Sequence, residues 1–189
     1  MSDSKNTAIP PLPPVIRYLS RDSLQSLQLT PQEIVASIEH LILGRRQQAW
    51  NAPKAVITPP DGRYMMATLA ASDDPPFLAV KALVLNPDNP KHGLQSINAL
   101  VTLLDSRTGL PLAILDGNWV TAARTAGLSA VAAKRLAKPD ASTAAFIGCG
   151  VQAQSLLQAF AELFPLKQIW AFGRGTANRD ALCQSDEAM

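Results

Sequence analysis

The pattern of hydrophobic and polar positions changes near residue 117 and divides the chain into two regions. Before this point, a helical apolar pattern is followed by short apolar runs between turn sequences, which predicts an α+β arrangement. After it, helices and strands alternate, which is typical of an α/β fold with parallel strands. We therefore expect an N-terminal α+β region followed by an α/β region.

The first region is predicted to contain one long helix and five strands. The helix begins at Pro31, because Thr30 and Glu33 have the spacing of a capping box and proline is favoured in the first helical turn. Apolar residues then recur at helical spacing to about Gln48. Strands bounded by turn sequences are expected at 14–20, 54–58, 63–70, 77–85 and 98–105, and a further turn leads to "LAILD" at 112–116.

The second region begins with an alanine-rich helix. It is expected over 121–137, with Asp116 or Asn118 as its cap and with Lys134 and Arg135 near the negative end of the helix dipole. A strand at 143–148, a helix at about 151–163 and a strand at 167–172 follow. These last three elements have the order and length of a βαβ unit.

Composition narrows the class of protein. The chain has 189 residues, of which 47% are hydrophobic and 17% charged, as expected of a globular protein with a sizeable core. Its net charge of +2, with no basic block, argues against a nucleic-acid partner. No apolar run has the roughly 20 residues of a transmembrane helix, so no membrane partner is expected.

The cysteines and the N-terminus indicate the compartment. Cys149 and Cys183 form neither a metal-binding nor a disulfide pattern, so no metal site is predicted. Residues 1–14 lack the basic and apolar segments of a secretory signal and are expected to form a disordered or extended lead. We expect a cytoplasmic protein with domains at 15–117 and 118–189.

A glycine-rich loop joins the first strand of the βαβ unit to its helix. The loop, "GCGVQA" at 148–153, fits the pattern G-x-G-x-x-G/A in the strand–loop–helix context of dinucleotide binding. Gly148 allows the tight turn, Gly150 allows a pyrophosphate to approach the backbone, and Ala153 allows close helix–strand packing. Val151 and Gln152 complete the loop at a helix N-terminus, which attracts phosphate. A glycine turn with a purely structural role is the alternative.

The residues after the second strand bear on the choice of cofactor. An acidic residue that binds the ribose of NAD is expected about 20 residues after the glycines. The segment "FGRGT" at 172–176 has no acid, and Arg174, with Thr176 nearby, is suited to the 2′-phosphate of NADP. NADP is therefore preferred over NAD, and a solvated arginine is the alternative.

Several segments together resemble a known family. They are "LDGNWVTAARTAGLSAVAAKRLA", "FIGCGVQAQ" and "AFGR", and the upstream segment 80–117 matches as well. Over roughly Lys54 to Arg174 the chain resembles the ornithine cyclodeaminase and mu-crystallin family. The resemblance implies a substrate-binding and dimerisation domain, a Rossmann-like dinucleotide-binding domain, and a homodimer formed through the strands at 54–105.

The resemblance also implies an activity. Family members cyclise ornithine to proline with loss of ammonia, reduce ketimines such as pyrroline-2-carboxylate, or oxidise alanine, using NAD or NADP. Mu-crystallins also bind small hormones. A small amino acid or cyclic imino acid is therefore the expected substrate. A non-catalytic NADP(H)-binding protein, or an inactive truncated fragment of such an enzyme, is the alternative.

The resemblance assigns roles to four polar residues. Lys81 aligns with the family's catalytic lysine, which contacts the substrate carboxylate and assists proton transfer, although by itself a lysine in a strand indicates an exposed edge. Arg124 aligns with an arginine near the cofactor and the substrate carboxylate, and Ser96 with a threonine that contacts the cofactor. Lys54 stands where the family usually has a carboxylate-binding arginine, so it keeps the charge and loses the two-pronged hydrogen bond. A solvated Lys54 is an equally good interpretation.

The position of Arg124 in its helix supports its role. If the helix begins at 121, Arg124 lies in the first turn, where the helix dipole disfavours a cation. A bound anion would offset this cost. The sequence alone therefore also points to an anion near Arg124.

The resemblance finally implies that part of the family fold lies beyond this chain. The last segment, "TANRDALCQSDEAM", begins like the family's next helix, and the catalytic aspartate and the returning C-terminal segment would follow it. We therefore expect a C-terminally truncated member with a partial Rossmann-like domain. Parallel strands need cover on both faces, so exposed apolar surface and a tendency to associate are expected.

Overall fold

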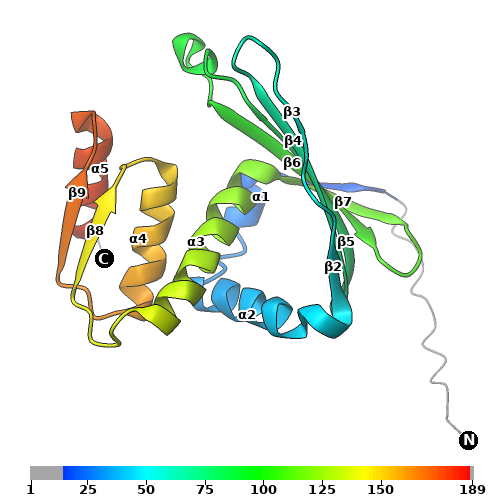
Figure 1. The fold of residues 1–189 in the computed structure, drawn as a ribbon, viewed down its shortest axis with the longest axis horizontal. Coiled ribbons are helices and arrows are strands. Elements are labelled where there is room, and N and C mark those ends of the chain that lie inside the picture. Colours follow the sequence, from blue (N-terminus) through cyan, green and yellow to red (C-terminus); the bar gives the residue numbers. More distant parts are fainter. Residues whose placement is uncertain (1–14, 188–189) are drawn as a thin grey trace, which may run out of the picture.

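The computed structural model describes the backbone of residues 15–187 and the side chains of 15–44 and 49–184. Two sheets of unequal size lie in two lobes, and helix α3 (Gly117–Leu136) runs from one lobe to the other (Figure 1). The expected lead at 1–14 lies outside the described residues. No helix in the described part of the chain has both the length and the hydropathy needed to cross a bilayer.

The first lobe is built on a seven-stranded sheet, which we call sheet A. Its strand order is β1-β7-β6-β5-β4-β2, with β3 also paired to β4. All pairs are antiparallel except β1 with β7, so neighbouring strands are mostly joined by short turns. The strands are β1 (Arg17–Leu19), β2 (Ala49–Asn51), β3 (Ala55–Ile57), β4 (Tyr64–Asp73), β5 (Pro76–Leu85), β6 (Ile97–Asp105) and β7 (Pro111–Asp116).

The predicted strands of this lobe are confirmed, with two differences. Strands β4 and β5 extend further than predicted and form a tighter hairpin, in which Ser72 Oγ bonds both the backbone N–H and the carbonyl of Asp74. Strand β2 was not predicted, because three residues directly after a helix show no period-two pattern.

One face of sheet A packs against helices. Lys81 lies opposite Val101 in the β5–β6 ladder, and side chains two residues apart share a face. Leu83 and Val101 on this face are buried, and α3 contacts both strands. The other face leaves Met65, Leu69 and Leu100 exposed, which gives sheet A an open apolar surface.

Local capping explains where the helices begin. Helix α2 (Pro31–Gln48) starts at the predicted capping box, with Thr30 and Glu33 bonding each other's backbone N–H. Helix α3 begins at Gly117, four residues before the predicted start, because Asp116 accepts a hydrogen bond from the N–H of Trp119 at 2.7 Å. The short helix α1 (Arg21–Gln25) and the 3₁₀ turn η1 (Asn89–His92) were not predicted, since neither is long enough to show a period.

The second lobe contains the predicted βαβ unit and one further helix. Its elements are β8 (Thr143–Ile147), α4 (Val151–Leu163), β9 (Gln168–Phe172) and α5 (Thr176–Glu187). The two strands pair in parallel and form sheet B. Helices α4 and α5 cover one face, where Phe146, Leu157 and Leu182 are buried together.

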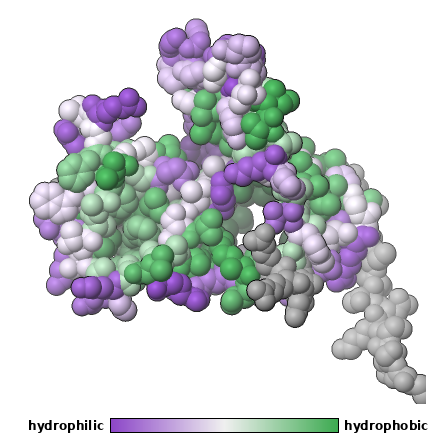
Figure 2. Space-filling model, viewed as in Figure 1, coloured by the Kyte–Doolittle hydropathy of each residue, from purple (hydrophilic) through white to green (hydrophobic). Residues whose placement is uncertain are grey.

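The other face of sheet B is bare. Ile147 is 93% exposed, and Trp170 and Phe172 are also exposed beside it on the paired strand. Hydrophobic residues reach the surface of both lobes (Figure 2). The expectation of exposed apolar surface in the second region therefore agrees with the structure.

Two glycines let α3 approach its neighbours. A Cβ on Gly117 would lie 2.4 Å from the backbone carbon of Ala99 on β6, and one on Gly127 would lie 2.7 Å from Ile34 and Ile38 of α2. Further along, α3 packs against α4. Helix α3 thus contacts elements of both lobes, and the predicted domain boundary at 117 and 118, where it begins, stays a prediction.

Candidate functional site

The glycine loop leaves the carboxyl end of β8 and opens helix α4. Gly148 has φ +97°, a backbone conformation that favours glycine, and its N–H donates to the carbonyl of Phe172 on β9 at 2.7 Å. Gly150 is the N-cap of α4, and no side chain caps this helix. A Cβ on Gly150 would meet nothing within 4 Å, so open space lies in front of the helix N-terminus. The loop geometry therefore fits a bound phosphate.

The other loop residues lie as the pattern predicts. Ala153 is buried under the first turn of α4, where a larger side chain would separate helix and strand. Val151 and Gln152 are exposed. Cys149 is buried, and its Sγ contacts the carbonyl of Phe172 at 3.5 Å. Its burial agrees with a packing role for this cysteine.

Arg174 and Thr176 follow the carboxyl end of β9, next to the glycine loop. Because β8 and β9 are parallel neighbours, the segments after them leave the same edge of the sheet. Both side chains are exposed, and Thr176 begins α5. Their predicted contact with a cofactor stays a prediction.

Lys81 lies in the first lobe, in the centre of sheet A. It belongs to β5, which is paired on both sides with β4 and β6, so the interpretation as an edge-strand lysine is wrong. The side chain is half-buried and turns toward α3, where Nζ donates a hydrogen bond to Thr121 Oγ1 at 2.7 Å. Burial, and then the positive charges of Arg124 and Lys54, lower the pKa of Lys81 below its ordinary value.

Two of the three cations predicted to bind substrate therefore act on the third, Lys81. Lys54 precedes β3, Lys81 lies on β5, and Arg124 lies on α3, so the fold brings charges from distant parts of the sequence near enough to act on Lys81. Among the described residues, the charged groups that shift the pKa of Lys81 are both cations. We call Lys54, Lys81 and Arg124 the cation cluster. Such a cluster attracts an anion.

The helix dipole does not disfavour Arg124, contrary to the prediction. Since α3 begins at Gly117, Arg124 is the eighth residue of the helix and lies beyond the first turn, where the dipole acts. Arg124 and Lys54 are both exposed. The case for an anion at this place rests on the cluster of charges rather than on the dipole.

Ser96 lies just before β6, close to the start of α3. Its carbonyl accepts a hydrogen bond from the N–H of Asn86 at 2.8 Å, and the neighbouring Gln95 bonds Asn118 in the first turn of α3 at 2.6 Å. The side chain of Ser96 is half-buried. Its contact with a cofactor stays a prediction.

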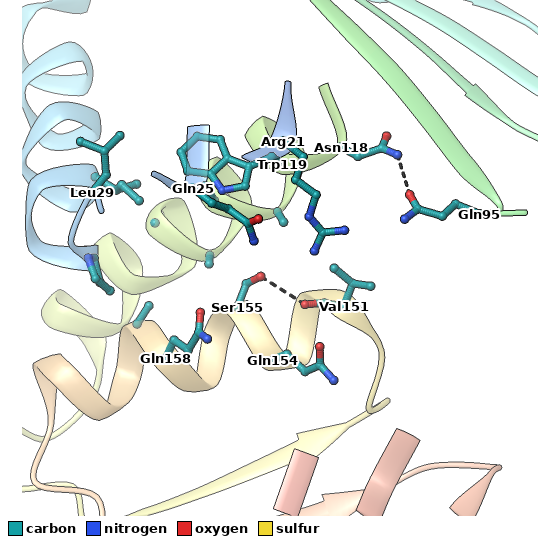
Figure 3. Close-up of a pocket in the computed structure, with 17 residues that line it drawn as sticks. Arg21, Gln25, Leu29, Gln95, Asn118, Trp119, Val151, Gln154, Ser155 and Gln158 are labelled. Carbon is teal, nitrogen blue, oxygen red and sulfur yellow. Dashed lines mark hydrogen bonds between the residues drawn. The ribbon is translucent and has the colours of Figure 1, made fainter. Parts of the chain in front are cut away.

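A cleft of about 320 Å³ lies between α3 and α4 (Figure 3). Its lining includes Arg21, Trp119, Gln154 and Ala126. Arg21 points from α1 toward the start of α4. With 3.6 residues per turn, Trp119 and Ala126 lie on the opposite face of α3 from Arg124. The cleft is therefore separate from the cation cluster. Of the residues that line it, sequence reasoning named only Val151 of the glycine loop as a site residue, since the others come from separate elements and share no motif.

Comparison with known families identifies the group to which the chain belongs. The sequence profile of the ornithine cyclodeaminase/mu-crystallin family matches residues 21–188. The chain belongs to this family. The resemblance seen in the sequence is confirmed.

Individual relatives span more than this chain. A Rhizobium meliloti protein provisionally named a dehydrogenase is 34% identical over 175 residues, which are 88% of this chain and 51% of that protein. The structure of Thermococcus litoralis Δ1-pyrroline-2-carboxylate reductase with NADH and L-proline is 31% identical, with a TM-score of 0.86 over 92% of this chain and 54% of its own. An archaeal alanine dehydrogenase dimer with bound NAD is 27% identical, with a TM-score of 0.84 over 92% and 53%.

The chain therefore spans about half the length of the relatives it matches. The structural likeness confirms the predicted α/β fold class and is consistent with a Rossmann-like dinucleotide-binding domain. Within the described residues, no three His, Cys, Asp or Glu side chains gather where they would hold a metal ion.

Thr121 is a site residue to which sequence reasoning assigned no role. It lies in the family segment "TAART" at 121–125, one helical turn before Arg124. Its hydroxyl accepts from Lys81 and donates to the carbonyl of Gly117. The spacing to Arg124 was the available signal, because residues three apart share a helix face.

Proposed function

We propose that this family member acts in NAD(P)-dependent oxidation or reduction of a small amino acid or cyclic imino acid. The observation that carries the proposal is the cation cluster, in which the charges of Arg124 and Lys54 act on Lys81 while Thr121 holds its Nζ. A carboxylate is the anion that amino and imino acids share. The related reductase of Thermococcus litoralis was solved with NADH and L-proline, which supports this class of substrate.

The glycine loop is suited to the cofactor. Open space before Gly150 and the uncapped N-terminus of α4 leave room and a partial positive charge for a pyrophosphate. The conformation of Gly148 directs the chain from β8 into this helix. When bound, a nicotinamide cofactor supplies or accepts a hydride. The contribution of this chain is to hold the phosphates through the loop backbone.

Lys81 is suited to move the proton that accompanies the hydride. Its pKa is lowered by burial and by Arg124 and Lys54, so its neutral form is reached at a lower pH than in an ordinary lysine. As an amine it accepts a proton from the substrate nitrogen, and as an ammonium it returns one. Arg124 and Lys54 hold the carboxylate in this proposal, and Lys54 does so as a point charge, without the fork of an arginine.

The preference for NADP over NAD is part of the proposal. Arg174 is exposed at the end of β9, where a cofactor ribose would lie. Both solved relatives described above contain NAD or NADH, which supports NAD as the alternative. Replacing Arg174 by alanine should weaken NADPH binding about tenfold and leave NADH binding unchanged, since one charged hydrogen-bonding partner is lost. Equal weakening would contradict the NADP preference.

A homodimer through sheet A is the proposed assembly. The sheet face opposite α3 exposes Met65, Leu69 and Leu100, and this face belongs to the segment 54–105 expected to form the interface. The related archaeal alanine dehydrogenase is described as a dimer. The cytoplasmic location stays a prediction.

A second candidate is a protein that binds the cofactor without catalysis. The resemblance includes proteins of this kind, and the chain spans about half the length of the relatives it matches. In this case the cofactor would bind and no imine would be reduced. An inactive fragment would bind neither cofactor nor substrate.

Cofactor titration separates these candidates. NADPH or NADH is added to the purified chain, and nucleotide fluorescence and melting temperature are followed. We expect a saturable signal and a rise in melting temperature. Gly150→Val should abolish both without unfolding the chain, because its side chain would enter the space left for phosphate. Leu136→Ala, an exposed substitution on α3, is the matched control.

Activity assays then divide enzyme from binder. They follow reduction of pyrroline-2-carboxylate and release of ammonia from ornithine. Turnover of either supports the first proposal, and saturable binding without turnover supports the second. No saturable response to either nucleotide would contradict both.

A further inference from the structure

Thr121 connects Lys81 to the backbone of α3. Its Oγ1 accepts a hydrogen bond from Lys81 Nζ at 2.7 Å and donates its own to the carbonyl oxygen of Gly117, one helical turn earlier. A threonine hydroxyl has a single proton, and here that proton is donated to the carbonyl oxygen of Gly117. Toward Lys81, Thr121 is therefore an acceptor and not a donor.

The direction of these hydrogen bonds affects the neutral form of Lys81. A lysine ammonium has three N–H donors, and the neutral amine has two N–H donors and one lone pair. In both forms one N–H is bonded to Thr121. Thr121 cannot donate to the lone pair, because its single hydroxyl proton is already donated to the carbonyl oxygen of Gly117. The lone pair of the neutral amine is left for a proton from a bound molecule.

We propose that Thr121 is a positioning residue that fixes Lys81 Nζ by one hydrogen bond and keeps its lone pair available to the nitrogen of a bound amino or imino acid. The identity of the bound molecule rests on the proposed function. In the step that Thr121 supports, an N–H bond of the substrate breaks and an N–H bond on Lys81 forms. The step moves one proton and no electrons, and its reverse returns the proton to the substrate.

The surroundings of Lys81 allow this role to be tested by titration. Among the described residues, the charged groups that act on Lys81 are Arg124 from α3 and Lys54 from the segment before β3. Its ladder neighbours, Thr68 on β4 and Val101 on β6, carry no charge. Removal of one uncharged hydroxyl thus leaves every charge in place, so a change in the titration of Lys81 reports the lost hydrogen bond.

The experiment measures the reactivity of Lys81 toward acetic anhydride as a function of pH, read by mass spectrometry in the free chain. A hydrogen bond that accepts from the ammonium favours the charged form, so Thr121→Val should lower the labelling midpoint of Lys81 by about half a pH unit or more. Thr121→Ser keeps the hydroxyl and should restore the parent midpoint. If Thr121 had only a packing role, the loss in Thr121→Val and the recovery in Thr121→Ser would not be seen together.

Thr125→Val is the matched control. Its Oγ1 is buried one turn further along α3 and, within the described part of the chain, has no hydrogen-bond partner. This variant should leave the midpoint of Lys81 unchanged. A shift equal to that of Thr121→Val would overturn the proposal, because it would reflect loosening of α3 in general.

One further outcome is decisive. An unchanged midpoint in folded Thr121→Val overturns the proposal, and Thr121→Ala is measured in the same way if the valine variant does not fold. The titration needs neither substrate nor cofactor. Failure of the proposed function would instead be seen as the absence of NADH or NADPH binding, so the two failures are distinguishable.

Discussion

The two lobes contribute to the candidate site in different ways. In the first lobe, charged side chains project from regular elements, and Lys81 is fixed between paired strands and a helix. In the second lobe, the candidate phosphate site is made by backbone, at the turn of Gly148 and the uncapped start of α4. One lobe supplies charge and proton transfer, and the other supplies shape and backbone N–H groups.

The lobes also differ in how completely their sheets are covered. Sheet A has seven strands, and α3 covers the face that carries Lys81. Sheet B has two strands with helices on one face, and Ile147 on the other face is 93% exposed. Parallel strands normally have cover on both faces. Sheet B is therefore held by one small cluster under α4 and α5, while α4 also packs against α3.

The largest expected effect breaks that cluster. Leu157 is 0% exposed among Phe146, Leu182 and their neighbours, so Leu157→Ala should cost about 2–5 kcal/mol and release sheet B. Urea unfolding and hydrogen exchange of the β8 and β9 amides measure this. Leu136→Ala, at 86% exposure, should change stability by less than about 0.5 kcal/mol. Equal effects of the two variants would contradict the account of the second lobe.

The next effect tests how α3 is held against sheet A. A Cβ on Gly117 would press on the backbone of Ala99, so Gly117→Ala should cost about 1–3 kcal/mol in urea unfolding. The variant should also shift the labelling midpoint of Lys81, because the Gly117 carbonyl holds Thr121. Leu128→Ala on the exposed side of α3 is the control. Unchanged stability and labelling would show that this contact does not position the helix.

A smaller change concerns the bare face of sheet B. Ile147→Ser removes an exposed apolar side chain and should change stability by less than about 0.5 kcal/mol. It should reduce self-association, because it interrupts the apolar surface shared with Trp170 and Phe172. Sedimentation velocity over a concentration series measures this. Association that is insensitive to the substitution would place the contact elsewhere, for example on sheet A.

The same contrast explains what the sequence could predict. The glycine loop and the βαβ unit are contiguous in sequence, so local spacing was enough to find Gly148, Gly150 and the elements around them. The capping box of α2 was found for the same reason. The start of α3 was misplaced because Asp116 and Asn118 are both good caps, and the structure uses the first.

The cation cluster could not be derived from local pattern. Lys54, Lys81 and Arg124 are separated by long stretches of chain, and their meeting depends on the strand order of sheet A. Before the structure, only the family resemblance connected them, and it assigned no role to Thr121. A hydrogen bond between residues 40 apart leaves no periodic signal.

The smallest expected effect is a pH dependence of stability. The pKa of Lys81 is lowered in the folded chain, so between that value and the ordinary lysine value the unfolded state binds more protons and stability rises with pH. Arg124→Met should raise the pKa of Lys81 in the folded chain and so narrow the pH range over which stability rises. Lys54→Met should have the same effect to a smaller extent. Urea midpoints from pH 7 to above the ordinary lysine pKa, about 10.4, measure both. Lys91→Met, which removes an exposed ion pair, is the control. If stability changed with pH equally in Arg124→Met and in the parent, the lowered pKa of Lys81 could not be attributed to Arg124.

The central claim is that the cation cluster binds a carboxylate beside Lys81. The most direct measurement is the labelling midpoint of Lys81 with and without saturating L-proline, with L-prolinamide as the control that lacks the carboxylate. A bound carboxylate favours the ammonium, so L-proline should raise the midpoint, the amide should not, and Arg124→Met should reduce the rise. An unchanged midpoint with L-proline, or an equal rise with the amide, would contradict the account.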